Sequence, residues 1–240
     1  MDELIVERFD SAQRRAISML GSLTRQAEPG MGARDLTAMA GDLLASHDFE
    51  RWLRPPAVRI ALPGAQRPAW RPGSQPTRLG PGSALTLRLQ PAAGLVSAHV
   101  GATVIVGAPE TDIVAAARDC TRALCGYASG LKCVGELFIY AHTWALTHGQ
   151  ELTDRRSIGH ALPVEPAPGE GLAARLRSAA WLRRNQVHLL NPRRLSGLWV
   201  IAPTLAMGGA SASFHEVVLI QPGLRRVLGR DDLDQVGSLL

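Results

Sequence analysis

The order in which helical and strand-like patterns follow one another constrains the fold of this chain most strongly. Residues 3–27, and then the stretch after the turn at Pro29-Gly30, carry apolar side chains at helical spacing. The runs "SALTLRLQ" and "LVSAHVGATVIVG" follow as two strand-like segments, joined by the turn residues "PAAG". Residues 110–126 and 131–148 again read as helices, and "QVHLL", "GLWVIAP" and "FHEVVLI" read as strands. Helices and then strands, twice over, predict an α+β domain with two similar halves.

Two segments interrupt this order. Residues 63–83 are rich in Pro and Gly, which predicts an irregular loop long enough to cover part of the molecule. A polar, Pro-rich link and a short helix near residues 170–182 precede the last strands. The length of 240 residues suits one large domain or two small ones, and we treat residues 1–240 as a single domain.

Charge and cysteine content narrow the functional classes. Lys and Arg number 26 against 21 Asp and Glu, but the arginines are spread along the chain, and aromatic residues make up only 5%. Nucleic-acid binding usually needs a gathered basic patch and rings for stacking, so the sequence argues against it. The three cysteines favour a reducing compartment, and neither a signal peptide nor a membrane-spanning run is present. We therefore expect a cytoplasmic protein that does not contact a membrane.

The run "FHEVVLI" places two ionisable residues, His215 and Glu216, at the start of a buried-type strand. Neighbouring side chains of a strand point to opposite faces of the sheet. Only one of the two therefore faces whatever cavity the strand lines, and that residue is a candidate for the functional site.

Several short strings, in a fixed order, give the chain a family likeness. From "PGMGARDL" through "GPGSALTLRL", "AHVGATVIVG", "SIGHAL" and "GLWVIAP" to "HEVVLI", the sequence resembles the pita-bread family of methionine aminopeptidases, Xaa-Pro dipeptidases and creatinase. The likeness covers nearly the whole chain. It implies the pita-bread fold, in which two similar αβ halves form a curved antiparallel sheet covered by helices.

The same resemblance shows what has changed at the site. Active peptidases of the family hold two metal ions with two Asp, one His and two Glu. The positions that match these five ligands are occupied here by Arg88, His99, His160, Ala202 and His215. Arg88 and His99 keep the eleven-residue spacing of the family's Asp pair, and the match selects His215 rather than Glu216 as the cavity residue. No carboxylate ligand survives, so an aminopeptidase with two metal ions is not expected.

Three histidines at ligand positions suggest a different centre. The resemblance implies that His99, His160 and His215 converge, and three imidazoles with an open position suit one transition metal ion, either Fe, Zn or Cu. On this interpretation the protein is an enzyme of hydrolase, lyase or oxygen-using type, with Ala202 leaving room for the substrate. The alternatives are a metal-free pseudoenzyme that acts as a binding module, and a metal-free hydrolase similar to creatinase, in which His160 or His99 is the base.

Two further residues are candidates for contacts with the substrate. Arg88 can pair with a carboxylate or phosphate through its fork of donors, which predicts a small anionic substrate, or it can simply replace the lost metal charge. Trp70 lies in the irregular loop, where it can supply an apolar wall for the substrate or anchor the loop. A homodimer is left open by the sequence.

Overall fold

The structure is a computed structural model, and it describes residues 2–63, 77–153, 156–162, 185–222 and 224–230. Its α-helices are α1 (Glu3–Arg25), α2 (Ala33–Ser46), α3 (Asp112–Tyr127) and α4 (Val134–Thr147), and a short 3-10 helix, η1 (Ala128–Gly130), follows α3. Its strands are β1 (Arg51–Ala61), β2 (Ala84–Ala93), β3 (Val96–Ser97), β4 (Val100–Ile105), β5 (Glu151–Leu152), β6 (Gly159–Ala161), β7 (Gly197–Ile201), β8 (Thr204–Met207), β9 (Ala210–Gln221) and β10 (Leu224–Val227).

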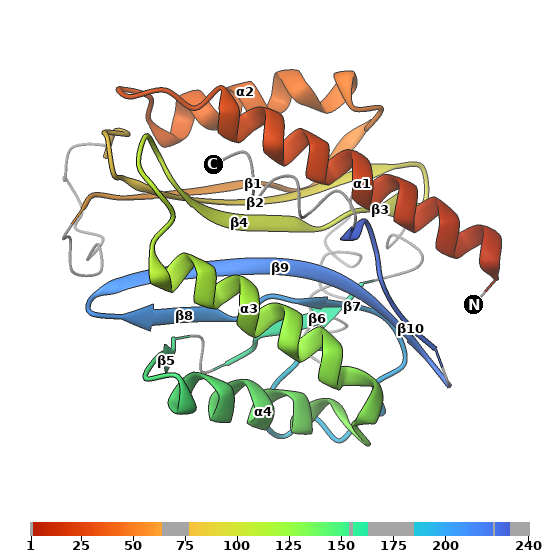
Figure 1. The fold of residues 1–240 in the computed structure, drawn as a ribbon. Coiled ribbons are helices and arrows are strands. Elements are labelled where there is room, and N and C mark those ends of the chain that lie inside the picture. The colour runs from red at the N-terminus through yellow and green to blue at the C-terminus, as the bar shows by residue number, and fades with distance from the viewer. Residues whose placement is uncertain (1, 64–76, 154–155, 163–184, 223, 231–240) are drawn as a thin grey trace.

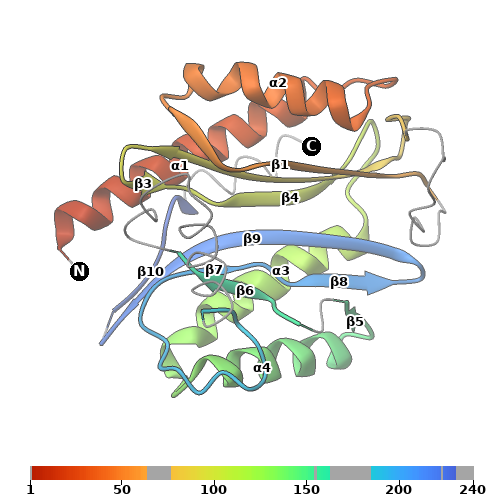
Figure 2. The same cartoon turned by 180° about the vertical axis from the view of Figure 1, so that it is seen from behind.

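The strands form one curved antiparallel sheet whose main path runs β1-β2-β4-β9-β7-β6. Helices α1 and α2 pack on the outer face of the β1-β2-β4 half, and α3 and α4 lie outside the β9-β7-β6 half (Figure 1). The view from behind shows the same order of layers (Figure 2). The sequence prediction of two similar αβ halves around a curved sheet is therefore confirmed. The helices cover the outer face of the sheet, and the concave inner face carries the cavity described below.

Local sequence explains both the helices and the sheet. Helix α1 begins where the Asp2 side chain accepts a hydrogen bond from the Leu4 amide at 3.2 Å, a standard N-cap. Its apolar residues Phe9, Ile17 and Leu20 are almost fully buried against the sheet, and each such side chain contributes about 1.5–3 kcal/mol by leaving water.

Strand β2 alternates cleanly between two environments. Leu85, Leu87 and Leu89 are fully buried on the helix-covered side. The residue that follows each of them points into the concave face, namely Thr86, Arg88 and Gln90. This period of two shows that a single strand supplies the core with one face and the site with the other.

One predicted strand is absent from the described residues. The run "QVHLL" is not a strand, because Gln186 makes only an isolated bridge to His160, and Leu189 and Leu190 lie exposed in a turn. The Asn191 side chain closes this turn, donating to the Gln186 carbonyl at 2.7 Å and accepting from the Arg193 amide at 3.0 Å. The hydrogen bonds of the Asn191 side chain therefore favour a turn here, although the apolar residues before it are typical of a strand.

The predicted helix at 170–182 and most of the predicted loop at 63–83, with Trp70, lie outside the described residues. Within the described ranges, no helix combines the length and the apolar character that crossing a bilayer requires.

Candidate functional site

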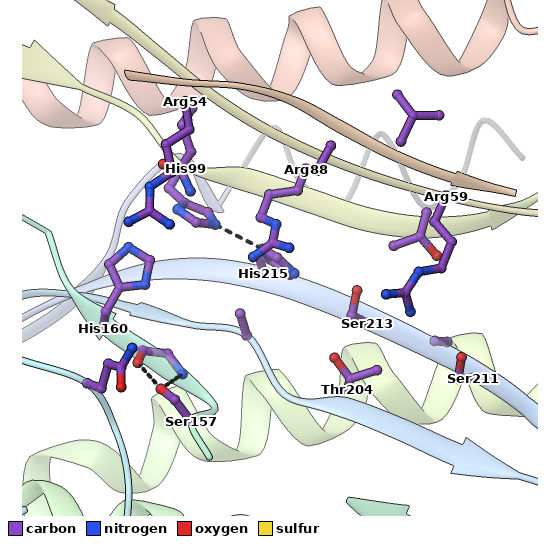
Figure 3. Close-up of a pocket in the computed structure, with 18 residues that line it drawn as sticks. Arg54, Arg59, Arg88, His99, Ser157, His160, Thr204, Ser211, Ser213 and His215 are labelled. Atoms are coloured by element: carbon purple, nitrogen blue, oxygen red, sulfur yellow. Dashed lines mark hydrogen bonds between the residues drawn. The ribbon is translucent and has the colours of Figure 1, made fainter. Parts of the chain in front are cut away.

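A cavity of about 420 Å³ opens on the concave face of the sheet (Figure 3). Its walls come from β1, β2 and β9, from the segment 157–160, and from the turn between β7 and β8. The ionisable side chains among its described lining residues are all basic or imidazole groups, namely Arg54, Arg59, Arg88, His99, His160 and His215. None of the described lining residues carries a carboxylate, so the cavity is a cationic environment.

Strand register sets these side chains in rows across the sheet. One row runs through Arg88 on β2, Gly101 on β4 and His215 on β9, which are direct neighbours. The next row runs through Thr86 and Thr103, whose hydroxyls are hydrogen-bonded at 2.9 Å, and the Ser213 amide donates to the Thr103 hydroxyl at 3.0 Å. The curvature of the sheet turns these rows inward, toward one another.

The three histidines gather at one end of the cavity. The ring of His99 lies between the other two, with centroid distances of 5.1 Å to His160 and 5.2 Å to His215. His99 Nε2 and His215 Nδ1 share a hydrogen bond of 3.0 Å. The structure therefore brings His99, His160 and His215 together at one place.

Helix α1 fixes His99 from behind. The His99 amide donates to Gln13 Oε1 at 3.1 Å, and Gln13 Nε2 donates to the His99 carbonyl at 2.9 Å. Both residues are 1% exposed, so water cannot replace either bond. Nothing in the sequence marked Gln13 as a support of the site.

Glycines allow the other two rings to approach. A Cβ atom at Gly101 would lie 2.6 Å from His215 Nδ1, so the imidazole occupies the space that a side chain would fill. A Cβ atom at Gly159 would overlap the carbonyl oxygen of Val200, so the glycine lets β6 pair closely with β7 and set His160 at the cavity wall.

Burial keeps the imidazoles neutral. Burial, followed by the charges of Arg88 and His160, lowers the pKa of His215 to about 3. Burial, followed by Arg54 and Arg88, lowers the pKa of His160 to about 4. The pKa of His99 lies well below its ordinary value, chiefly because of burial and then the neighbouring imidazoles. At neutral pH the arginines thus hold the positive charge of the cavity.

The shared hydrogen bond favours one tautomer of the pair. His99 Nδ1 is buried without a hydrogen-bond partner among the described residues. A buried N–H without a partner is rarer than a bare acceptor, so we assign the shared proton to His99 Nε2 and leave Nδ1 unprotonated. His215 Nδ1 then accepts, and its Nε2 carries an N–H that is free to donate to a ligand.

A single metal ion does not fit this arrangement. In the part of the chain that the structure describes, no group of three or more His, Cys, Asp or Glu is placed to hold a metal ion. His99 Nε2 and His215 Nδ1 are hydrogen-bonded to each other, and Arg54 and Arg88 bring permanent positive charge close to the rings, which disfavours a cation there. The predicted transition metal on His99, His160 and His215 is therefore not supported, although the residues themselves come together.

The other predicted residues divide clearly. Arg88 and Ala202 line the cavity. Glu216 is fully buried on the opposite face of β9, where it helps to raise the pKa of the Cys125 thiol, so His215 faces the cavity as expected. Sequence reasoning missed Arg54 and Arg59, although the alternation of "AVRIAL" places Arg59 on the polar face of its strand.

Comparison with known proteins agrees on architecture. No family model and no curated protein matches the sequence. The structure is similar to X-Pro aminopeptidase from Thermotoga maritima MSB8, with a TM-score of 0.71 and 14% identity over 95% of this chain and 62% of that one. It is also similar to prolidase from Pyrococcus furiosus, with a TM-score of 0.70 and 14% identity over 95% and 64% of the two chains.

A shorter neighbour matches almost end to end. Methionine aminopeptidase from Thermotoga maritima gives a TM-score of 0.69 and 13% identity over 95% of this chain and 98% of that one. The chain thus spans less than two thirds of the first two relatives and nearly the whole of the third. These neighbours are pita-bread proteins, and the likeness confirms the pita-bread fold of this chain.

Proposed function

From a pita-bread fold whose cavity is lined with arginines and histidines, we propose that this protein binds a small anionic molecule and exchanges a proton with it through His160, without metal-dependent peptidase chemistry. The observation that carries the proposal is the lining, with three arginines, three histidines and no carboxylate among its described residues. Such a lining attracts an acid group and repels a divalent cation.

Arg88 is the central anchor. It stands next to Gly101 and His215 in the sheet, and its guanidinium lies beside the His215 ring (Figure 3). A carboxylate or phosphate bound there can accept from Arg88 and from the His215 Nε2–H together. Charge-assisted bonds of this kind are roughly twice as strong as neutral ones.

His160 is the residue suited to proton exchange. It is half-buried, whereas His99 and His215 are 1% and 5% exposed and are bonded to each other. Its depressed pKa makes it a neutral base at neutral pH. A bound anion raises the pKa of a neighbouring imidazole, so His160 takes up a proton more readily once the cavity is filled.

The alternative is a metal-free binding module, which would hold the same anion without proton exchange. Calorimetric titration with sulfate separates the two, because the charge of sulfate is constant between pH 5 and pH 8. Arg88→Gln should weaken sulfate binding about tenfold or more. Arg34→Gln, at an exposed position on α2, is the matched control and should not change it.

Proton exchange is tested in the same experiment. Near pH 5.5, sulfate binding to the wild type should take up a proton, seen as a dependence of the binding heat on the ionisation enthalpy of the buffer. His160→Gln should abolish this uptake while keeping the affinity within a few fold. Binding without uptake favours the module, and no sulfate binding at all refutes both forms.

Elemental analysis completes the test. Protein purified without chelator or histidine tag should hold no stoichiometric Fe, Zn or Cu. One equivalent of any of these metals, lost in His160→Ala, would overturn the metal-free proposal in favour of the three-histidine centre.

A further inference from the structure

The cavity has basic groups at both of its ends. On the edge strand, Arg54 is paired with Gln90 of β2, whereas Arg59 is paired with Thr86. These two rows lie four residues apart along β2, which corresponds to roughly 13 Å in an extended strand. Arg88 belongs to the row between them.

A bulge brings Arg54 onto the cavity face. Arg59 comes five positions after Arg54, and in a regular strand an odd number of positions puts the two side chains on opposite faces. Between Arg54 and Ala57, however, β1 advances by three residues while β2 advances by two, from Gln90 to Arg88. The extra residue, within the Pro55-Pro56 pair, compensates for the odd separation. Arg54 and Arg59 therefore both lie on the face of β1 that lines the cavity.

The far end of the cavity differs from the histidine end. Arg59 lies with Thr204, Ser211 and Ser213 around it (Figure 3). Ser211 and Ser213 continue the face of β9 that carries His215, at the alternate positions that a strand requires. No described residue forms an ion pair with Arg59. The guanidinium and the neighbouring hydroxyl groups can all donate hydrogen bonds to the oxygens of a carboxylate or phosphate.

Electrostatics agree that the two ends are separate. Arg54 and Arg88 both lower the pKa values of His99 and His160, whereas Arg59 has no such effect on any of the three histidines. Figure 3 agrees, because Arg88 lies between His160 and Arg59 along the cavity.

We propose that the cavity takes a molecule with an acidic group at each end: one held by Arg54 and Arg88 beside the histidines, the other held by Arg59, Ser211 and Ser213. This inference rests on the proposed function and adds to it the class of ligand, an elongated dianion. It makes Arg59 a specificity-determining residue and the Pro55-Pro56 bulge the device that positions Arg54. A cavity of about 420 Å³ is large enough for such a molecule.

The test compares straight-chain dicarboxylates, from succinate to sebacate, with monocarboxylates of equal length by calorimetry. The longer dicarboxylates should bind at least tenfold more tightly than the matched monocarboxylates. Arg59→Gln should remove that advantage, so that each dicarboxylate binds no more tightly than its matched monocarboxylate, whereas the control Arg34→Gln, at an exposed position on α2, should keep it. Deletion of Pro55, which removes the extra residue of the bulge, should weaken the binding of both classes, because Arg54 then turns away from the cavity.

The outcomes separate this inference from the proposal on which it rests. Equal affinity for dicarboxylates and monocarboxylates, or a dicarboxylate preference that survives in Arg59→Gln, overturns the second subsite while anion binding at Arg88 stands. Loss of sulfate binding in the wild type overturns both. If the Pro55 deletion fails to fold, Arg54→Gln tests the same end of the cavity, and unchanged dicarboxylate affinity in that variant also refutes the inference.

Discussion

Replacing His215 with Asn should make the protein less sensitive to acid. In the folded protein burial holds the pKa of His215 at about 3, whereas an unfolded histidine titrates near 6.5. Because the folded pKa is the lower one, the neutral ring supports the fold fully above about pH 6.5, and this support declines as the pH falls toward 3. At about pH 5 the loss amounts to about 2 kcal/mol relative to pH 8.

The variant keeps most of the local structure, since the Asn amide can replace Nδ1 in the hydrogen bond to His99. It lacks the titrating ring, so its free energy of unfolding should fall by about 2 kcal/mol less than that of the wild type between pH 8 and pH 5. Urea unfolding of both proteins at the two pH values measures the difference. His142→Asn, at an exposed position on α4, is the control and should follow the wild type.

An equally steep decline in His215→Asn would refute the reasoning, because it would mean that His215 takes up its proton in the folded state as easily as in the unfolded state. A direct measurement is available as well. In an NMR titration, the His215 ring should remain neutral down to at least pH 5, and a midpoint near 6.5 would contradict the structure.

Three further predictions concern the supports of the site. Gly101→Ala should displace the His215 ring, lower the free energy of unfolding by about 1–3 kcal/mol in urea and weaken sulfate binding; full stability with unchanged binding would contradict the contact. Gln13→Leu should cost about 1–3 kcal/mol, because it leaves the buried amide and carbonyl of His99 unpaired, and hydrogen exchange at the His99 amide should accelerate. Sulfate should bind more tightly as the pH falls from 7 to 5, because binding raises the lowered pKa of His160, and His160→Gln should remove this dependence.

Much of the fold could be predicted because the pattern of each element agrees with its surroundings. Helices α1 to α4 and the strands β2, β4, β7 and β9 lie where their periodicities place them. The run "QVHLL" was predicted wrongly, since composition alone does not show that the Asn191 side chain closes a turn there.

The site was predictable only where side chains follow the simple alternation of a strand. The resemblance located Arg88, His99, His160 and His215, and all four line one cavity. Arg54 could not be predicted as a cavity residue, because a bulge changes which face of the strand its side chain is on. The sequence does not show where such a shift in strand register occurs. The predicted metal is not supported among the described residues for a related reason: ligand positions can be inferred from a resemblance, but the arginines that surround them cannot.

The proline pair in β1 also bears on how this protein behaves at high concentration. Among the described strands, β1 ends the main path of the sheet, and an outer strand is where another molecule can add a strand of its own. Pro55 and Pro56 have no amide hydrogen to offer such a partner, and the kink between them interrupts the flat surface that aggregation needs. The residues that orient Arg54 therefore also protect this end of the described sheet against fibril-like association.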